Sequence, residues 1–251
     1  MPLTSPTADT PQYTLSRCLA LHLLPGAVTT LIYIVLAPLV TRAGFPTLLA
    51  LLTATLIGFV PLELGHLFIM GKRLNGDWSL KGVVLYDRPG TWRRYVLLVP
   101  AIVVLALGAY FLAAPLDRIW GHTLFSWLPS WFTYSDLSTY TRFSRTVLLI
   151  TFSVRLLVDG VIAPVTEELY FRGYLLPRIS RFGWGAPFLN CFLFSLYHFW
   201  QPYNLPSIFF LCLPMVIAAW KTRSVRVSLL VHMVLNLIGG IGVMSAVLRV
   251  H

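Results

Sequence analysis

Seven apolar runs, separated by short polar stretches, dominate this sequence. They occupy residues 18–41, 45–71, 95–115, 144–180, 185–201, 206–221 and 226–248. Because a helix needs about 20 apolar residues to cross the hydrocarbon core of a bilayer, most of these runs are long enough to span a membrane, and the run 144–180 is too long for one straight crossing. Only 11% of the residues are charged, whereas a soluble domain has about 25%. The sequence therefore predicts an all-α, polytopic transmembrane bundle of about seven helices in an integral membrane protein.

The segments between these runs divide the chain into three parts. Residues 1–17 are polar, with no basic residue before Arg17, whereas a cleaved secretory signal begins with a charged region; we expect a flexible N-terminal tail. Residues 18–143 are expected to hold N-terminal transmembrane helices and, over 116–143, an interfacial loop rich in Trp and Tyr. Residues 144–251 hold the remaining runs. The three cysteines lie singly and lack the spacing of a zinc finger or a disulfide framework.

The net charge of +10 does not indicate a nucleic-acid-binding protein. Such a protein needs a continuous basic face, and here the basic residues lie in short loops between apolar runs. Twelve Lys and Arg residues fall on the side that includes residues 72–94 and 221–226, and five fall on the other side. Since cytoplasmic loops carry the excess of Lys and Arg, we expect a cytoplasmic N-terminus and, after seven crossings, a C-terminus outside.

Ionisable residues inside the apolar runs are few. A charge at the centre of a bilayer costs about 2.5–3.5 kcal/mol on insertion scales, so each such residue is a functional candidate. The depth of a residue in the membrane can be counted along its helix at 1.5 Å per residue. Counted in this way, Glu167, His198, His232 and Asn236, which come from three separate helices, lie at similar depths of about 9–21 Å. The candidates are Glu63 with His66; Arg155, Asp159, Glu167, Glu168 and Arg172; and His198 with His232 and Asn236.

Spacing within each helix assigns these side chains to faces. Glu168 and Arg172 are four residues apart, so they share a helix face and can form an ion pair. Glu167 is turned about 100° away from Glu168. A carboxylate in a dry site beside a like charge holds a proton more readily than one in water, which suits a general base near neutral pH. His232 and Asn236 also share a face, and an imidazole beside an amide can donate hydrogen bonds to a developing oxyanion.

Three motifs contain these residues in order: EELYFR at 167–172, FSLYH at 194–198 and HMVLN at 232–236. They match the patterns EExxxR, FxxxH and HxxxN. Over residues 144–245 the chain therefore resembles the CAAX protease and bacteriocin-processing family (CPBP, Abi) of intramembrane proteases, which includes the Ras-converting CAAX endopeptidases. The resemblance implies that residues 144–251 form a four-helix catalytic core and that the chain is an intramembrane endopeptidase.

The resemblance also implies a role for each catalytic residue. Glu167 would activate a water that His198 helps to hold, while His232 and Asn236 would stabilise the tetrahedral oxyanion. The implied substrate is a membrane-associated, lipidated or leader-peptide protein, and membrane lipid is the other expected partner. We expect no nucleic-acid partner. The stretch 63–86 resembles bacterial members of the family, which implies a bacterial plasma membrane.

Structural roles compete with some of these assignments. For Glu168 and Arg172 the resemblance implies a supporting pair that orients their helix, and buried ion pairs of this spacing often only join helices. A single buried histidine or asparagine is more often a packing or helix-joining residue, so the catalytic hypothesis depends on the residues occurring together. Glu63 and His66 lie three residues apart and are either a packing pair or part of a supporting or substrate-access element.

Other mechanisms and functions stay open. The sequence lacks HExxH, which excludes a zincin. We favour a reaction without a cofactor, because His232 and Asn236 on one face suit oxyanion donors; zinc held by Glu167, His198 and His232 is the alternative. A proton-coupled transporter would also need buried acids, but no inverted repeat is visible. A non-catalytic immunity or scaffold protein would keep the fold, yet this chain keeps all four candidate catalytic residues.

Overall fold

The computed structural model describes residues 10–88, 90–133 and 137–249, and these residues contain helices and two isolated β-bridges but no strand. This confirms the predicted all-α fold. The α-helices are α1 (Leu15–Arg42), α2 (Thr47–Ile57), α3 (Phe59–Asn75), α4 (Trp92–Leu124), α5 (Arg145–Leu157), α6 (Ala163–Glu167), α7 (Gly185–Tyr197), α8 (Leu205–Thr222) and α9 (Val225–Leu248).

Within the described residues, six helical stretches are long and apolar enough to cross a membrane. The remaining predicted span contains α7, which is apolar but only 13 residues long, and a full crossing needs about 20. The apolar run continues to residue 201, yet the helix ends at Tyr197 and leaves His198 at its C-cap. The chain is therefore an integral membrane protein with about seven membrane helices, one of which is short.

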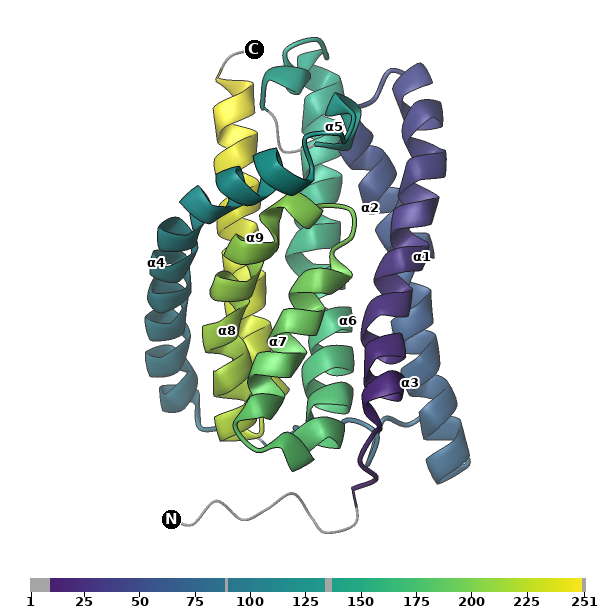
Figure 1. The fold of residues 1–251 in the computed structure, drawn as a ribbon, viewed down its shortest axis with the longest axis vertical. Helices are drawn as coiled ribbons and strands as arrows, with labels where there is room; N and C mark the ends of the chain where they lie inside the picture. The colour runs from purple at the N-terminus through teal and green to yellow at the C-terminus, as the bar shows by residue number, and fades with distance from the viewer. Residues whose placement is uncertain (1–9, 89, 134–136, 250–251) are drawn as a thin grey trace.

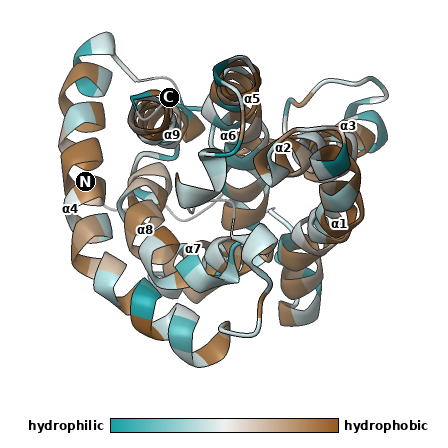
Figure 2. Cartoon of the chain, turned by 90° about the horizontal axis from the view of Figure 1, so that it is seen from above, coloured by the Kyte–Doolittle hydropathy of each residue, from teal (hydrophilic) through white to brown (hydrophobic). Residues whose placement is uncertain are grey.

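The helices stand side by side in a bundle, and the described chain begins and ends at opposite ends of it (Figure 1). Seen from above, α5 and α6 lie between α9 on one side and α2 and α3 on the other, with α5 at the edge of the bundle (Figure 2). Helix α1 packs against α2, α3 and α7, while α4 lies outside, against α8 and α9. The helix that carries the first motif thus runs through the middle of the molecule.

The fourth span is one continuous helical stretch of 38 residues, Arg145–Phe182. Its α-helical turns are interrupted by the π-helical segments Val158–Ile162 and Glu168–Leu175, and it ends in the 3-10 segment Leu176–Phe182. Pro164 lacks an N–H, so one α-helical hydrogen bond is missing there, and the Ala163 N–H donates to the Val158 carbonyl, five residues back. π-helical turns occur frequently at functional sites; here they flank α6, which ends at Glu167, and the second of them begins at Glu168.

Part of the predicted interfacial loop 116–143 is helical. Helix α4 continues through Pro115 to Leu124, because a proline kinks a helix without always ending it. The helix bends around the outside of α8 (Figure 2). The rest of this segment contains the short 3-10 turns Ser130–Phe132 and Leu137–Tyr140, and residues 134–136 lie outside the described residues.

The first helix begins inside the segment that we expected to be a flexible tail, residues 1–17. Thr14 caps α1, and the buried Tyr13 donates its N–H to the Arg178 carbonyl at 2.8 Å and shares a hydrogen bond between hydroxyl groups with Tyr174. The end of the tail is therefore attached to the fourth span. Residues 1–9 of the expected tail lie outside the described residues.

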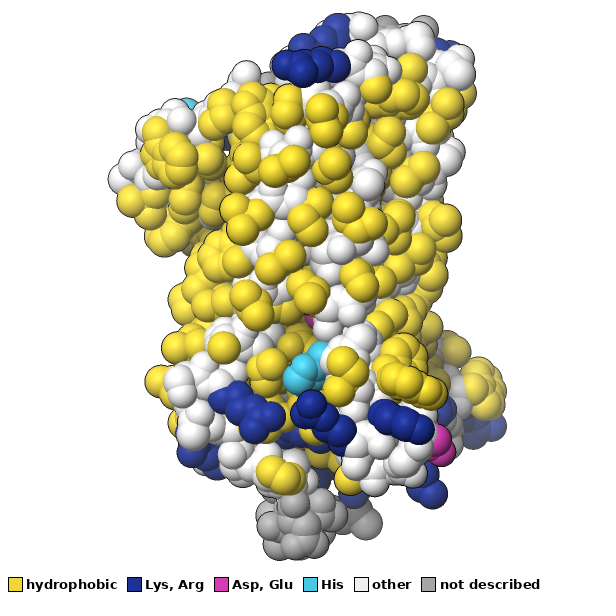
Figure 3. Space-filling model, turned by 90° about the vertical axis from the view of Figure 1, so that its right-hand side faces the viewer, with side chains coloured by type: hydrophobic (Ala, Val, Ile, Leu, Met, Phe, Trp, Pro, Cys, Tyr) yellow, Lys and Arg dark blue, Asp and Glu magenta, His cyan; other side chains and the backbone are white. Residues whose placement is uncertain are grey.

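The basic side chains are distributed unevenly over the surface. On the face shown in Figure 3, Lys and Arg side chains gather mainly near one end, below a broad hydrophobic band, with fewer at the other end.

Helices from both predicted parts, 18–143 and 144–251, contribute to one hydrophobic core, so the boundary at residue 144 stays a prediction from sequence.

Candidate active site

The structure brings the first motif into a buried position at the centre of the bundle. Glu167 is the last residue of α6, and Glu168 begins the π-helical segment that follows. Their exposed fractions are 3% and 0%. A buried carboxylate is tolerated only when hydrogen bonds or opposite charges compensate it, so the partners of each glutamate indicate its role.

Glu168 has two partners on its Oε1 atom. Arg172 Nη1 lies 3.3 Å away and His232 Nδ1 lies 3.0 Å away. The fully buried Arg172 guanidinium also lies over the Phe194 ring, 4.0 Å from its centroid, and such a cation–π contact lowers the cost of burying the charge. The structure therefore brings Glu168 and Arg172 together as the spacing predicted, and adds His232 from another helix.

Glu167 faces the two histidines of the other motifs. Its Oε1 lies 4.0 Å from His198 Nε2, and its Oε2 lies 3.8 Å from His232 Nε2. These separations are too long for direct hydrogen bonds, which span about 2.7–3.2 Å. The carboxylate thus sits between two imidazole nitrogens without closing onto either.

Local bonds fix which nitrogen each histidine presents. His198 lies directly after α7, and its Nδ1 is 2.7 Å from the Phe194 carbonyl oxygen, four residues earlier. A carbonyl only accepts, so Nδ1 carries the proton and Nε2 points at Glu167 with a free lone pair. This contact explains the FxxxH spacing, since the first and last residues of the motif are the two partners. His232 is held in the same way, because its Nδ1–H donates to Glu168.

Asn236 lies one turn after His232 on α9, but its described bond leads away from Glu167. Its Nδ2 donates to the backbone carbonyl of Asp159 at 2.7 Å, and Asp159 itself pairs with Arg155 at 3.4 Å. The asparagine therefore joins α9 to the π-helical part of the fourth span. One amide N–H of Asn236 is left for another acceptor.

Glu63 and His66 turn out to have different partners. The His66 Nε2 lies 3.0 Å from the Tyr174 hydroxyl, toward the end of the fourth span. Glu63 is fully buried and interacts with Glu167 and with the Tyr197 hydroxyl. The sequence signal for this carboxylate was its position inside an apolar run, but that signal did not show which helix it faces.

The set of Glu167, His198 and His232 is also the alternative zinc site. Both imidazoles present Nε2 while Nδ1 is bonded elsewhere, as zinc-bound histidines commonly do. However, their distances of 3.8 and 4.0 Å from Glu167 oxygens exceed the roughly 3.4 Å between two tetrahedral zinc ligands at ordinary bond lengths. In the described part of the chain, no group of three or more His, Cys, Asp or Glu side chains is placed to hold a metal ion. The side chains as they stand do not match a zinc site.

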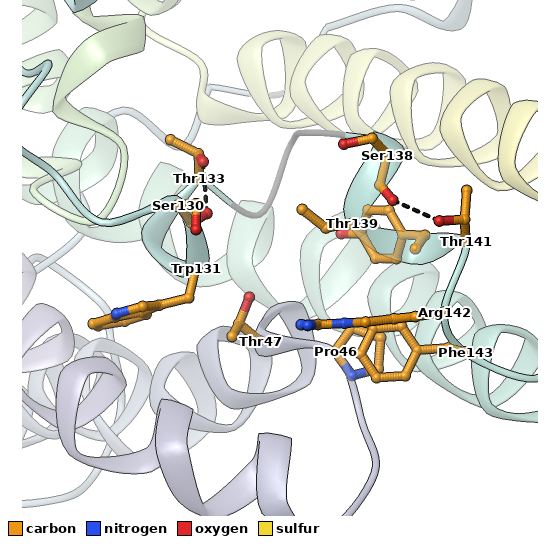
Figure 4. A pocket seen from close by; sticks show the side chains of 11 residues that line it. Pro46, Thr47, Ser130, Trp131, Thr133, Ser138, Thr139, Thr141, Arg142 and Phe143 are labelled. Atoms are coloured by element: carbon orange, nitrogen blue, oxygen red, sulfur yellow. Dashed lines mark hydrogen bonds between the residues drawn. The ribbon is translucent and has the colours of Figure 1, made fainter.

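A separate cavity of about 260 Å³ lies between the start of α2 and the turns that follow α4 (Figure 4). Hydroxyl groups and Arg142 line it, together with Trp131 and Phe143. None of its lining residues belongs to the three motifs. The motif residues are instead packed inside the helix bundle.

Comparison with known proteins agrees with the motifs. Residues 149–238 match the family model described as type II CAAX prenyl endopeptidase Rce1-like. No curated protein and no solved structure matches the chain. The matched segment contains the Glu pair, both motif histidines and Asn236, and a membrane-embedded family of this kind implies a lipid environment and peptide substrates. Residues 149–238 therefore match an Rce1-like type II CAAX prenyl endopeptidase domain, in agreement with the CAAX protease family that the three motifs predicted.

Proposed function

We propose that the protein is an intramembrane endopeptidase that hydrolyses a peptide bond at membrane depth with water activated by Glu167. One observation carries the proposal: the buried Glu167 carboxylate lies between the Nε2 atoms of His198 and His232, which come from two other elements of the bundle. The family of residues 149–238 supports endopeptidase chemistry.

The site geometry suits a water molecule as the nucleophile. A water about 2.8 Å from each partner would bridge Glu167 and a histidine at these separations. Glu167 takes a proton from the water while the oxygen bonds to the carbonyl carbon of the peptide, and an electron pair moves onto the carbonyl oxygen. As the C–N bond breaks, the proton passes from Glu167 to the leaving nitrogen. His198 accepts a hydrogen bond from the water through its free Nε2 and so orients it.

His232 and Asn236 are the proposed donors to the oxyanion. When the His232 ring carries protons on both nitrogens, it is a cation that Glu168 balances through Nδ1–H, and Nε2–H is free to donate. Asn236 supplies the amide N–H that Asp159 does not accept. Loss of one oxyanion donor typically costs about 10²–10³-fold in kcat.

We also propose the setting of the reaction. The greater number of Lys and Arg residues on the side of residues 72–94 supports a cytoplasmic N-terminus and a C-terminus outside. The resemblance of residues 63–86 to bacterial members supports a bacterial plasma membrane. A substrate must reach a site buried among apolar helices, which favours a lipidated protein or a leader peptide that already lies at the membrane.

Replacement of Glu167 by Gln tests the chemistry. Glutamine keeps the shape but cannot accept the proton, so cleavage should fall by about 10²–10⁴-fold while the protein still folds. Proteomics of membrane fractions should find new peptide termini with the wild type and not with Glu167→Gln. Asp77→Asn, the same change of carboxylate to amide in an exposed loop, is the matched control and should act like the wild type. Equal cleavage by Glu167→Gln would refute the mechanism.

Metal content separates the two mechanisms. We expect the purified protein to keep its activity in a chelator, because the proposed reaction needs no metal. Elemental mass spectrometry should be run beside the activity assay. Stoichiometric zinc that is lost and regained together with activity would replace the metal-free mechanism with the zinc alternative and leave the endopeptidase proposal intact.

A further inference from the structure

A third buried carboxyl group, that of Glu63 on α3, lies beside the motif residues. Its side chain is 0% exposed, and neither carboxyl oxygen has a partner at regular hydrogen-bond geometry. Among the described residues, no Lys, Arg or His nitrogen lies within 4.0 Å of it. Since an ionised carboxylate without a partner is very costly in a dry site, the surroundings of Glu63 favour a neutral acid.

The Tyr197 hydroxyl connects Glu63 to the catalytic glutamate. It is buried and interacts with the carboxyl groups of both Glu63 and Glu167, at a looser geometry than a regular hydrogen bond. The ring is held firmly: it packs edge-on against Phe171, with centroids 5.0 Å apart. Helix α1 approaches so closely that a Cβ on Gly26 would lie 2.0 Å from the Tyr197 carbonyl oxygen. Tyr197 therefore has little freedom to leave the two carboxyl groups.

The number of protons held by Glu63, Tyr197 and Glu167 together sets the direction of the hydrogen bonds among them. A phenol has one proton and donates to only one of two carboxyl groups. Two carboxylates in one dry site do not both ionise, so one of them holds a proton. His232, whose Nε2 lies 3.8 Å from Glu167, favours the ionised form of Glu167 when its ring is protonated, whereas Glu63 has no such neighbour in the described structure. The proton therefore belongs on Glu63.

Building on the proposed function, we propose that Glu63 is a positioning residue that acts on Glu167 through Tyr197. As a protonated acid, Glu63 donates to the Tyr197 oxygen, and this leaves the Tyr197 O–H to donate to the Glu167 carboxylate. The bond holds Glu167 in place between the Nε2 atoms of the two histidines. The proton of Glu63 stays on Glu63 throughout, so the proton from water still passes to Glu167 and then to the leaving nitrogen.

Three substitutions distinguish positioning from packing. Glu63→Leu puts an apolar side chain in the buried position and removes the donor to the Tyr197 oxygen. We expect kcat to fall by about 10–10²-fold, because the Tyr197 hydroxyl, and with it Glu167, loses its fixed orientation, and Tm measured beside it shows whether packing is kept. Tyr197→Phe should cause a similar fall, and the double variant should fall no further than the worse single variant. Glu63→Gln keeps a neutral N–H donor and should retain most of the activity, with KM little changed in all of them.

A matched control and a second readout complete the test. Tyr33→Phe removes another buried hydroxyl, one bonded to the Trp131 carbonyl far from the motifs, and should leave kcat unchanged. Infrared spectra in the Glu167→Gln background should show the C=O stretch of a buried protonated carboxylic acid that disappears in Glu63→Leu. Equal losses in Glu63→Gln and Glu63→Leu, or an infrared band that Glu63→Leu does not remove, would refute the positioning role and leave the protease proposal standing. Absence of any cleavage by the wild type would refute the protease proposal, and the infrared result would still decide whether Glu63 is protonated.

Discussion

At the scale of single residues, Arg172 is a buried charge whose predicted role is to support the site and not to take part in the reaction. Its guanidinium pairs with Glu168 and lies over Phe194. Arg172→Ala should leave Glu168 with His232 as its remaining partner, and breaking a buried pair costs about 3–5 kcal/mol. Because His232 still donates to Glu168, we expect the lower end of that range, seen as a lower Tm and a lower yield together with lower activity.

Arg181→Ala is the control for this prediction. Arg181 is exposed near the end of the same span, and removal of an exposed charge typically changes stability by less than about 1 kcal/mol. Thermal unfolding in detergent would compare both variants with the wild type. A stable but inactive Arg172→Ala would mean that the arginine acts in the reaction and that its supporting role is wrong.

Asn236 has a structural contact and a proposed role in the reaction, and its substitution should reveal both. Asn236→Ala removes the bond to the Asp159 carbonyl, worth about 1 kcal/mol, and also the proposed oxyanion donor. We expect a small loss in Tm and a fall in kcat of about 10²–10³-fold, with little change in KM. Asn75→Ala, in an exposed position at the end of α3, should leave kcat unchanged. A rise in KM at constant kcat would instead assign Asn236 to substrate binding.

At the scale of the helix, the π-helical turns around Pro164 lie next to Glu167, the proposed general base, and we expect them to set its orientation. Pro164→Ala restores the missing N–H and allows a regular α-helix, which is more stable than one with proline by up to about 3 kcal/mol. The turn that carries Glu167 would then rotate, and a misplacement of about 1 Å can cost 10²-fold in rate. We therefore expect unchanged or higher Tm with activity lower by up to about 10²-fold.

Pro38→Ala provides the comparison for this element. Pro38 also lies inside a membrane helix, α1, but at an exposed position outside the motifs, so this variant should keep full activity. Peptide cleavage and thermal unfolding would be measured for both variants. Full activity in Pro164→Ala would show that the π-helical turns do not orient Glu167.

The sequence predicted helices better than it predicted their ends and their faces. Apolar length revealed the membrane spans, but it did not show that α4 passes through Pro115 or that α7 ends at Tyr197, because proline and apolar residues occur both in helices and in loops. Spacing revealed pairs within one helix, such as Glu168 with Arg172. It did not reveal contacts across helices, such as Glu168 with His232, because counting the rise gives depth in the membrane and not the direction in which a side chain points.

At the scale of the whole molecule, the remaining prediction is the orientation in the membrane. The basic side chains gather mainly at one end of the face in Figure 3, and an excess of Lys and Arg marks the cytoplasmic side. Cysteine labelling in intact cells tests this well, because the three native cysteines are buried. Lys81 lies in the exposed loop after α3, and Ala43 is exposed at the other end of the bundle, between α1 and α2.

We expect an impermeant thiol reagent to label Ala43→Cys in intact cells and to label Lys81→Cys only after the cells are opened. The wild type should stay unlabelled in both conditions, since burial protects its thiols. The two variants serve as controls for each other, because the chain crosses the membrane between them and only one of the two positions can face outside. Labelling of Lys81→Cys from outside would invert the orientation, and with it the side of the membrane from which a substrate reaches Glu167.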